Sequence, residues 1–176
     1  MESFGVFLRG VNVGGVTIKS ADLRDCLAAL PVTGVKTLLA SGNAVMQTGL
    51  EAAELKASVE AALRERFGYE AWVVVLPGSR VRELIEACPY PADSKELHTY
   101  LTLFADSAAA DSLTAELASV DEEWTLLGPD ALAWTVAAGS TLDSPISKLT
   151  AKAAYKSSTT TRNLRTMIKV RDAAGA

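Results

Sequence analysis

Residues 7–15, FLRGVNVGG, run from an apolar, strand-like stretch into an arginine, an asparagine and three glycines. The residues before them favour a strand, because Phe4, Val6 and Leu8 alternate with their neighbours at the period of two that a strand produces. A helix is expected next, since Ser20 can cap it and apolar residues recur at helical spacing up to Pro31. The quoted stretch is therefore predicted to connect a strand to a helix.

The rest of the chain repeats this order of elements. Strands are predicted over 35–39 and 44–48 with a turn at Ser41-Gly42, followed by a helix over 52–67 and a strand over 72–76. A second run has a strand over 99–104, a helix over 108–118, a hairpin over 123–136 and helices beginning near 145 and near 161. No convincing fourth strand is predicted in this second run.

These orders predict an α+β protein of two ferredoxin-like units of βαββαβ type with antiparallel sheets, the second lacking a clear fourth strand. The expected division is 1–77 for the first unit, 78–97 for a linking helix and proline-rich connection, and 98–176 for the second unit with basic C-terminal helices. In the split βαβ arrangement the third strand lies between the first and the second, antiparallel to both. The ends of strands one and two and the start of strand three then share one edge.

That shared edge is the predicted location of a ligand site. Left-handed torsions and close approach of a ligand are easiest at glycine, and glycines stand at Gly10, Gly14, Gly15 and Gly42. Their spacing matches neither the dinucleotide-binding fingerprint nor a Walker loop. The guanidinium of Arg9, near the amide of Asn12, suits bidentate binding of a carboxylate or phosphate. The open alternatives are an ordinary glycine-rich turn and an internal salt bridge of Arg9.

The C-terminal block is basic within an acidic chain. Residues 144–176 carry seven Lys or Arg and one acid, net +6, whereas residues 1–143 carry net −10, which together give the −4 of the chain. Lys148, Lys152 and Lys156 are spaced to form a stripe on one helix face. Arg162 and Asn163 are expected in the first turn of the last helix. The N-terminus of a helix already has a partial positive charge, so an arginine there would be stabilised by a bound anion. An acid of the chain or solvated surface would explain these residues equally well.

Composition excludes several classes of protein. The longest apolar runs are far shorter than the roughly 20 residues of a membrane helix, and the N-terminus lacks the basic segment of a signal peptide, so we expect a cytoplasmic protein. Cys26 and Cys88 are expected to be buried free thiols. His98 is the single histidine and is interpreted as a surface residue. No metal site and no cofactor are predicted, and the oligomeric state is not predicted.

Four stretches together resemble the bacterial domain-of-unknown-function family numbered 1697, namely RGVNVGG at 9–15, LLASGNAVMQT at 38–48, SPISKL at 144–149 and TTRNLRTMIKV at 160–170. The resemblance implies two ferredoxin-like units and no established activity. Met46 and Leu164 stand where the family commonly has an aromatic residue and a tryptophan. The family's polar signature falls on Arg9, Asn12, Ser41, Gly42, Asn43, Ser147, Lys148, Thr161, Arg162 and Asn163.

The leading hypothesis is binding of an anionic small molecule, phosphorylated or carboxylated, in a basic cleft where the two units meet. The residues expected to line it are Arg9, Asn12, Ser41, Asn43, Lys148, Arg162 and Asn163. One alternative is an enzyme of phosphoryl or acyl transfer with Ser41 or Ser147 as nucleophile, although no base is evident. Others are non-specific nucleic-acid binding through the lysine stripe, without the aromatic RNA-recognition motif, and a purely architectural role.

Overall fold

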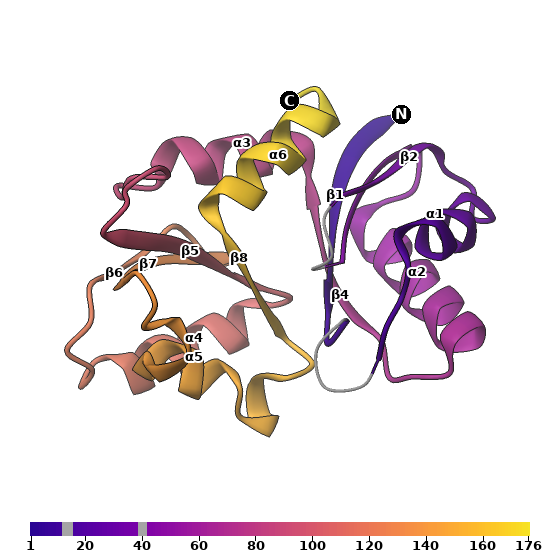
Figure 1. Cartoon of the computed structure of the whole chain (residues 1–176). Helices are drawn as coiled ribbons and strands as arrows, with labels where there is room; N and C mark the ends of the chain where they lie inside the picture. Colours follow the sequence, from indigo (N-terminus) through magenta and orange to yellow (C-terminus); the bar gives the residue numbers. More distant parts are fainter. Residues whose placement is uncertain (12–15, 39–41) are drawn as a thin grey trace. The chain divides into compact units, whose positions relative to one another are not determined.

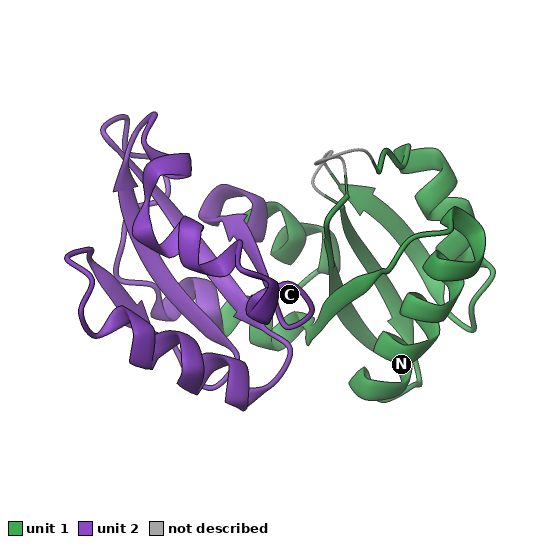
Figure 2. Cartoon of the chain, turned by 90° about the horizontal axis from the view of Figure 1, so that it is seen from below, with its two compact units in different colours: residues 1–83, 168–176 green, residues 84–167 purple. Residues whose placement is uncertain are grey.

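The computed structural model describes residues 1–11, 16–38 and 42–176. In this part of the chain, helices pack on two four-stranded antiparallel sheets, which confirms the α+β class (Figure 1). The chain divides into two compact units, coloured separately in Figure 2. Unit 1 comprises Met1–Glu83 and Ile168–Ala176, and unit 2 comprises Leu84–Met167.

The sheet of unit 1 has the strand order β2-β3-β1-β4. Each strand is antiparallel to its neighbours, so the third strand lies between the first and the second, as the split arrangement predicts. The elements of this unit are β1 (Glu2–Arg9), α1 (Ser20–Ala28), β2 (Thr33–Leu38), β3 (Asn43–Thr48), α2 (Ala52–Phe67), β4 (Trp72–Pro77) and the start of α3 (Gly78–Ala87).

Helices α1 and α2 cover one face of this sheet (Figure 1). Alternation along β1 directs Phe4, Val6 and Leu8 into the core beneath these helices, where each is at most 2% exposed. Helix α2 buries one stripe of its surface there and begins with a capping box formed by Glu51 and Glu54. The intervening residues of β1, among them Phe7 and Arg9, point to the opposite face of the sheet.

The sheet of unit 2 has the order β6-β7-β5-β8. This is the order of unit 1 when β5, β6, β7 and β8 are matched with β1, β2, β3 and β4. All its pairs are antiparallel. Its elements are β5 (Leu97–Phe104), α4 (Ser107–Leu117), β6 (Trp124–Leu126), β7 (Ala131–Ala137), η1 (Thr141–Asp143), α5 (Pro145–Thr150), η2 (Ala153–Tyr155), β8 (Thr159–Asn163) and α6 (Leu164–Ala174).

Strand β8 is a correction to the sequence-based expectation that unit 2 lacks a fourth strand. It begins with three β-branched threonines, which favour extended backbone. The hydroxyl of Thr161 is hydrogen-bonded to that of Thr102 on β5, at 2.9 Å. The last helix, expected to begin near Thr161, therefore begins at Leu164, and Asn163 Oδ1 caps it by accepting from Arg165 N at 2.9 Å.

The end of α6 belongs to unit 1, whereas the sequence-based division kept all of 98–176 together. The carbonyl groups in the last turn of a helix lack partners within it. In α6 two of them are satisfied from unit 1, since Ser3 Oγ donates to Ala174 O at 3.0 Å and Lys36 Nζ donates to Ala173 O at 3.4 Å. These bonds tie the C-terminal segment to β1 and β2.

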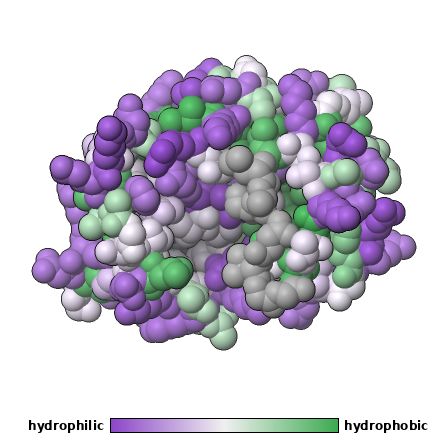
Figure 3. Space-filling model, viewed as in Figure 1, coloured by the Kyte–Doolittle hydropathy of each residue, from purple (hydrophilic) through white to green (hydrophobic). Residues whose placement is uncertain are grey.

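Polar and apolar side chains are interspersed on the surface. Hydrophilic residues, drawn in purple, surround smaller hydrophobic areas on the face shown in Figure 3. Among the described residues, the large apolar side chains that are exposed are Met1, Leu97, Leu126 and Leu142. None of the described helices combines the length and the apolar character needed to cross a membrane.

Candidate functional site

The end of β1 and the start of β3 lie side by side in unit 1. The register pairs Phe7 with Asn43, and Leu8 N donates to Gly42 O at 2.8 Å. Strand β1 ends at Arg9, so two polar segments that are distant in sequence meet at one end of the sheet, as its topology predicts. We call this place the Arg9 edge, and it comprises Arg9, Gly10, Gly42, Asn43 and Trp72.

Arg9 carries the positive charge of this edge. Its side chain is partly buried, and burial lowers the pKa of the guanidinium from its ordinary value. An arginine nevertheless stays protonated near neutral pH. Because water screens a partly buried cation less, its attraction to an anion is stronger there than on an open surface.

The two described glycines of the edge differ in their surroundings. Gly10 has φ +77°, and no described atom lies within 4 Å of the position that a Cβ would take. Gly42 has φ +75°, but a Cβ there would lie 3.0 Å from Leu8 Cβ and 3.4 Å from Val11 Cβ. Gly42 is therefore needed for packing β3 against β1, whereas a Cβ at Gly10 would contact none of the described residues.

Asn43 is fully buried at the start of β3. Its Nδ2 donates to Leu38 O at 3.0 Å, across the connection between β2 and β3. A buried amide needs such partners, and this bond gives Asn43 an architectural role in the hairpin. The remaining predicted residues of unit 1, Asn12, Gly14, Gly15 and Ser41, lie outside the described residues, and their place in a site stays a prediction.

Trp72 is a residue of this edge that was not predicted from the sequence. It is the first residue of β4, and the register pairs it directly with Arg9. Directly opposed residues of antiparallel strands have side chains on the same face. The sequence signal was the strong strand pattern of residues 72–76, but it becomes informative only with the β1–β4 register.

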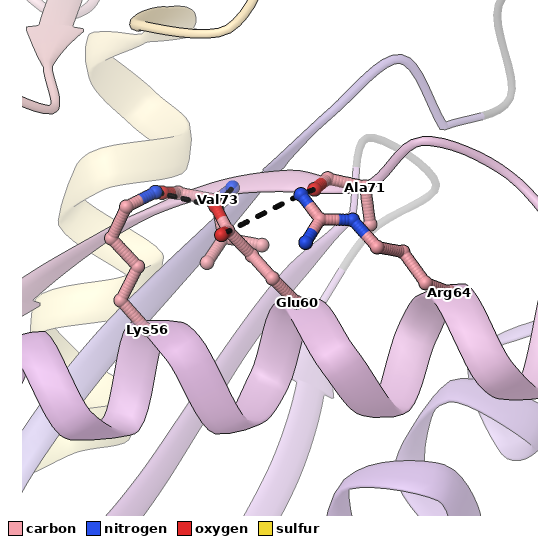
Figure 4. Close-up of polar contacts among 5 residues, drawn as sticks. All are labelled: Lys56, Glu60, Arg64, Ala71 and Val73. Atoms are coloured by element: carbon pink, nitrogen blue, oxygen red, sulfur yellow. Dashed lines mark hydrogen bonds and ion pairs between the residues drawn. The ribbon is translucent and has the colours of Figure 1, made fainter.

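Side chains of α2 hold the outer edge of β4 in place (Figure 4). Glu60 Oε1 accepts from Val73 N at 3.0 Å and from Lys56 Nζ, which also donates to Val73 O at 2.7 Å. Strand β4 is an edge strand, and Val73 would otherwise present its backbone groups to solvent or to another chain. The Lys56–Glu60 pair therefore takes the place of a neighbouring strand at Val73.

The same helix also contacts β4 at its beginning. Arg64 Nη2 donates to Ala71 O at 2.8 Å and lies 3.8 Å from Glu60 Oε2 (Figure 4). Ala71 and Val73 flank Trp72, so both neighbours of the tryptophan are hydrogen-bonded to side chains of α2. This arrangement positions the backbone of Trp72 opposite Arg9.

We expect Glu60→Ala to lower the free energy of unfolding by about 1–3 kcal/mol, because the backbone N–H of the buried Val73 loses its acceptor and Lys56 loses one of its two partners. Urea denaturation measures the change. Glu65→Ala, which removes an exposed carboxylate from the same helix, is the control and is expected to change stability by less than about 0.5 kcal/mol. Equal effects of the two substitutions would contradict the assigned role of Glu60.

Arg162 is a buried cation of unit 2, at 6% exposure. It lies in strand β8 and not in a helix, so the argument from a helix N-terminus does not apply to it. Its Nη1 donates to Thr160 Oγ1 at 2.6 Å and to Thr161 O at 3.0 Å. It pairs with Leu101, which places it on the face of the sheet opposite to α4 and α5.

The predicted lysine stripe does not form. Helix α5 ends at Thr150, and Lys152 has extended backbone and precedes the short helix η2. Lys152 Nζ instead donates to Glu116 Oε2 at 2.9 Å. Lys148 is exposed on α5 and shares no helix with Lys152 and Lys156. The nucleic-acid hypothesis thereby loses the pattern on which it was based.

Glu116 fixes this segment to α4. It accepts a hydrogen bond from Tyr155 Oη at 2.5 Å in addition to that from Lys152. These bonds, the one from Tyr155 first, lower the pKa of the Glu116 carboxyl group. Burial and the bond to Glu116 raise the pKa of Tyr155 to about 12. The carboxylate and the neutral phenol are thus the stable partners at neutral pH, and they hold Tyr155 in the core.

The candidate catalytic groups are not assembled in the described part of the chain. Ser147 N donates to Ser144 Oγ at 3.3 Å, but the described residues provide no histidine or carboxylate hydrogen-bonded to the Ser147 hydroxyl. His98 packs edge-on against Tyr100 with ring centroids 6.4 Å apart. No cluster of three metal-ligating side chains is found among the described residues.

The two cysteines are free thiols, as expected. Cys26 is buried, and its Sγ donates to Ala62 O at 3.6 Å, whereas Cys88 is only partly buried. Burial raises the pKa of both thiol groups. A raised thiol pKa leaves little thiolate at neutral pH, so neither cysteine has the character of a nucleophile.

The fold and the Arg9 edge define an α+β protein of two sheet-and-helix units with a partly buried arginine at a sheet end. Residues 1–130 match the family model described as "Protein of unknown function (DUF1697)". The match covers more than half of the chain, so the chain belongs to this family, and the resemblance noted in the sequence is confirmed.

A solved structure supports the fold over the whole length. A conserved bacterial protein from Streptococcus pneumoniae has a similar structure, with a TM-score of 0.80, 20% sequence identity and coverage of 98% of both chains. At this identity the similarity shows a common fold. The comparison with curated proteins gives no match.

Proposed function

We propose that the protein binds an anionic small molecule, phosphorylated or carboxylated, at the Arg9 edge of unit 1. The observation that carries the proposal is the partly buried guanidinium at the end of β1, directly before the open backbone of Gly10. A guanidinium presents parallel N–H donors that match two oxygens of a carboxylate or phosphate.

The partial burial of Arg9 supports this function energetically. Partial removal of the Arg9 guanidinium from water means that the solvent screens its charge less. An anion at Arg9 would therefore be attracted more strongly than at an exposed arginine. The lowered pKa of Arg9 reflects this desolvation.

The fold supports the same proposal. We infer that both units are ferredoxin-like, because each has the first and third strands at the centre of an antiparallel sheet. In such a sheet the end of the first strand lies beside the start of the third, and Leu8 near the end of β1 is hydrogen-bonded to Gly42. That Arg162, Asn163 and Lys148 of unit 2 contact the same ligand stays a prediction.

A thermal-shift screen with inorganic phosphate, ribose monophosphate and citrate at low ionic strength tests the proposal. At a ligand concentration near 100 times Kd we expect the melting temperature to rise by roughly 5–10 °C. Arg9→Gln should abolish this rise, because the amide cannot offer a charged fork.

The matched control is Arg24→Gln. Arg24 is an exposed arginine of unit 1 that pairs with Asp25 on α1, the helix that covers the face of the sheet opposite to Arg9. This variant should keep the full ligand-induced rise. A screen in which no anion stabilises the protein, or in which both variants respond like the wild type, would refute binding at the Arg9 edge.

A further inference from the structure

Arg9 and Trp72 form a cross-strand pair at one end of the sheet of unit 1. The last residue of β1 is paired with the first residue of β4. In an antiparallel sheet the Cβ atoms of such a pair are about 4.5–5.5 Å apart, and both side chains stand on the same face. A cation and a large aromatic surface are thus neighbours at the place where the chain leaves the sheet.

The orientation of Trp72 follows from its neighbour in sequence. The backbone groups of Val73 bond to Glu60 and Lys56 and therefore point away from β1. Successive residues of a strand alternate, so the backbone groups of Trp72 point toward Arg9. Because the side chain of Val73 belongs to the core beneath α1 and α2, the side chain of Trp72 lies on the opposite face. The two hydrogen bonds from Val73 to side chains of α2 stabilise this orientation of the β4 backbone.

The exposure of this face changes along the strands. On β4, Val74 and Leu76 are 4% and 6% exposed, and Phe7 on β1 is fully buried. Arg9 and Trp72, at the end of the same face, are only partly buried. At this end of the sheet, the side chains of Trp72 and Arg9 are therefore both partly exposed to solvent.

We propose that the anion bound at the Arg9 edge carries a planar aromatic ring, which stacks on the indole of Trp72 while the anionic group binds Arg9. This inference rests on the proposed function and adds the class of ligand. Indole faces stack on nucleobases of any sequence, because every base has a flat aromatic face. The bidentate fork of arginine supplies the second, charged contact.

Calorimetric titration with adenosine monophosphate, ribose monophosphate and adenosine separates the two contacts. We expect adenosine monophosphate to bind about tenfold or more tightly than ribose monophosphate, which corresponds to a stacking contribution near 1.4 kcal/mol. Adenosine, which lacks the anion, should bind more weakly than adenosine monophosphate. Equal affinities of the two phosphates in the wild-type protein would overturn the inference.

Substitution of Trp72 tests the residue itself. Trp72→Leu should weaken adenosine monophosphate to about the affinity of ribose monophosphate and leave ribose monophosphate unchanged, whereas Trp72→Tyr should restore most of the difference. If Trp72→Leu weakens both compounds equally, the indole only supports Arg9, and the inference is wrong. Circular dichroism verifies folding of each variant, and the wild-type comparison of ligands decides the question even if Trp72→Leu fails to fold.

The outcomes also distinguish this inference from the function on which it depends. Binding of ribose monophosphate that Arg9→Gln abolishes, without a gain from the adenine ring, would leave anion binding intact and remove the aromatic ligand. Failure of every phosphate compound to bind, or binding that Arg9→Gln does not change, would remove both.

Discussion

Trp134→Ala is expected to lower the free energy of unfolding by about 3–5 kcal/mol, the largest effect that we predict. Trp134 is 1% exposed, and its ring stacks on Tyr100 with centroids 4.9 Å apart. Its Nε1 donates to Thr102 Oγ1 at 3.1 Å, and Thr102 Oγ1 is also hydrogen-bonded to Thr161 Oγ1. The substitution therefore leaves a large cavity and disrupts a buried chain of polar contacts across β7, β5 and β8.

Denaturant unfolding followed by circular dichroism measures this effect, and Trp124→Ala is the matched control. Trp124 lies directly opposite Trp134 on β6 but is only partly buried. Its removal exposes less apolar surface and should cost clearly less than the removal of Trp134. Similar losses for both tryptophans would show that the core of unit 2 is not centred on Trp134.

Gly42→Ala is expected to cost roughly 2–5 kcal/mol, the second largest effect. Positive φ costs an L-residue about 1–2 kcal/mol, and overpacking typically adds about 1–3 kcal/mol. Both apply at Gly42, where φ is +75° and an added Cβ would lie 3.0 Å from Leu8 Cβ. The register of β3 against β1 should suffer, because Gly42 O accepts the hydrogen bond from Leu8 N.

Gly68→Ala separates the two contributions to this cost. Gly68 ends α2 with φ +64°, but no atom of the described residues lies within 4 Å of the position that its Cβ would take. This control should lose only the roughly 1–2 kcal/mol of backbone strain. Urea midpoints of the two variants that coincide would show that close packing at Gly42 contributes nothing.

The regular elements of unit 1 were predictable because its local signals agree with its tertiary structure. The alternation of Phe4, Val6 and Leu8 identified β1, and the spacing of apolar residues identified α2. The topology of the sheet then brought the segments around Arg9 and Gly42 together, as the pairing of Leu8 with Gly42 shows. Asn12 and Ser41 lie outside the described residues, so their share of this edge stays a prediction.

In the C-terminal part of the chain, the observed secondary structure follows tertiary contacts and differs from what the local sequence pattern predicts. Residues 159–163 adjoin a helical pattern, but the threonines pair with β5 and Asn163 serves as the cap of α6. Lys152 and Lys156 are spaced as on a helix, yet burial of Tyr155 and the ion pair between Lys152 and Glu116 end α5 earlier. Helix propensity is a weak signal when a core residue such as Tyr155 must reach the interior.

Trp72 could not be assigned to the Arg9 edge from sequence alone. Its stretch predicts a strand, but the residue that it faces depends on the register between β1 and β4. A shift of one residue would direct the indole to the opposite face. The register became known only with the structure, which places Trp72 beside Arg9.

Mapping of amide chemical shifts by NMR during titration with ribose monophosphate tests the central claim most directly. We predict that the largest shifts cluster at Leu8, Arg9, Gly10, Gly42 and the Trp72 backbone and indole N–H, and that they vanish in Arg9→Gln. Saturable shifts confined to other parts of the chain, with these signals unmoved, would contradict anion binding at the Arg9 edge.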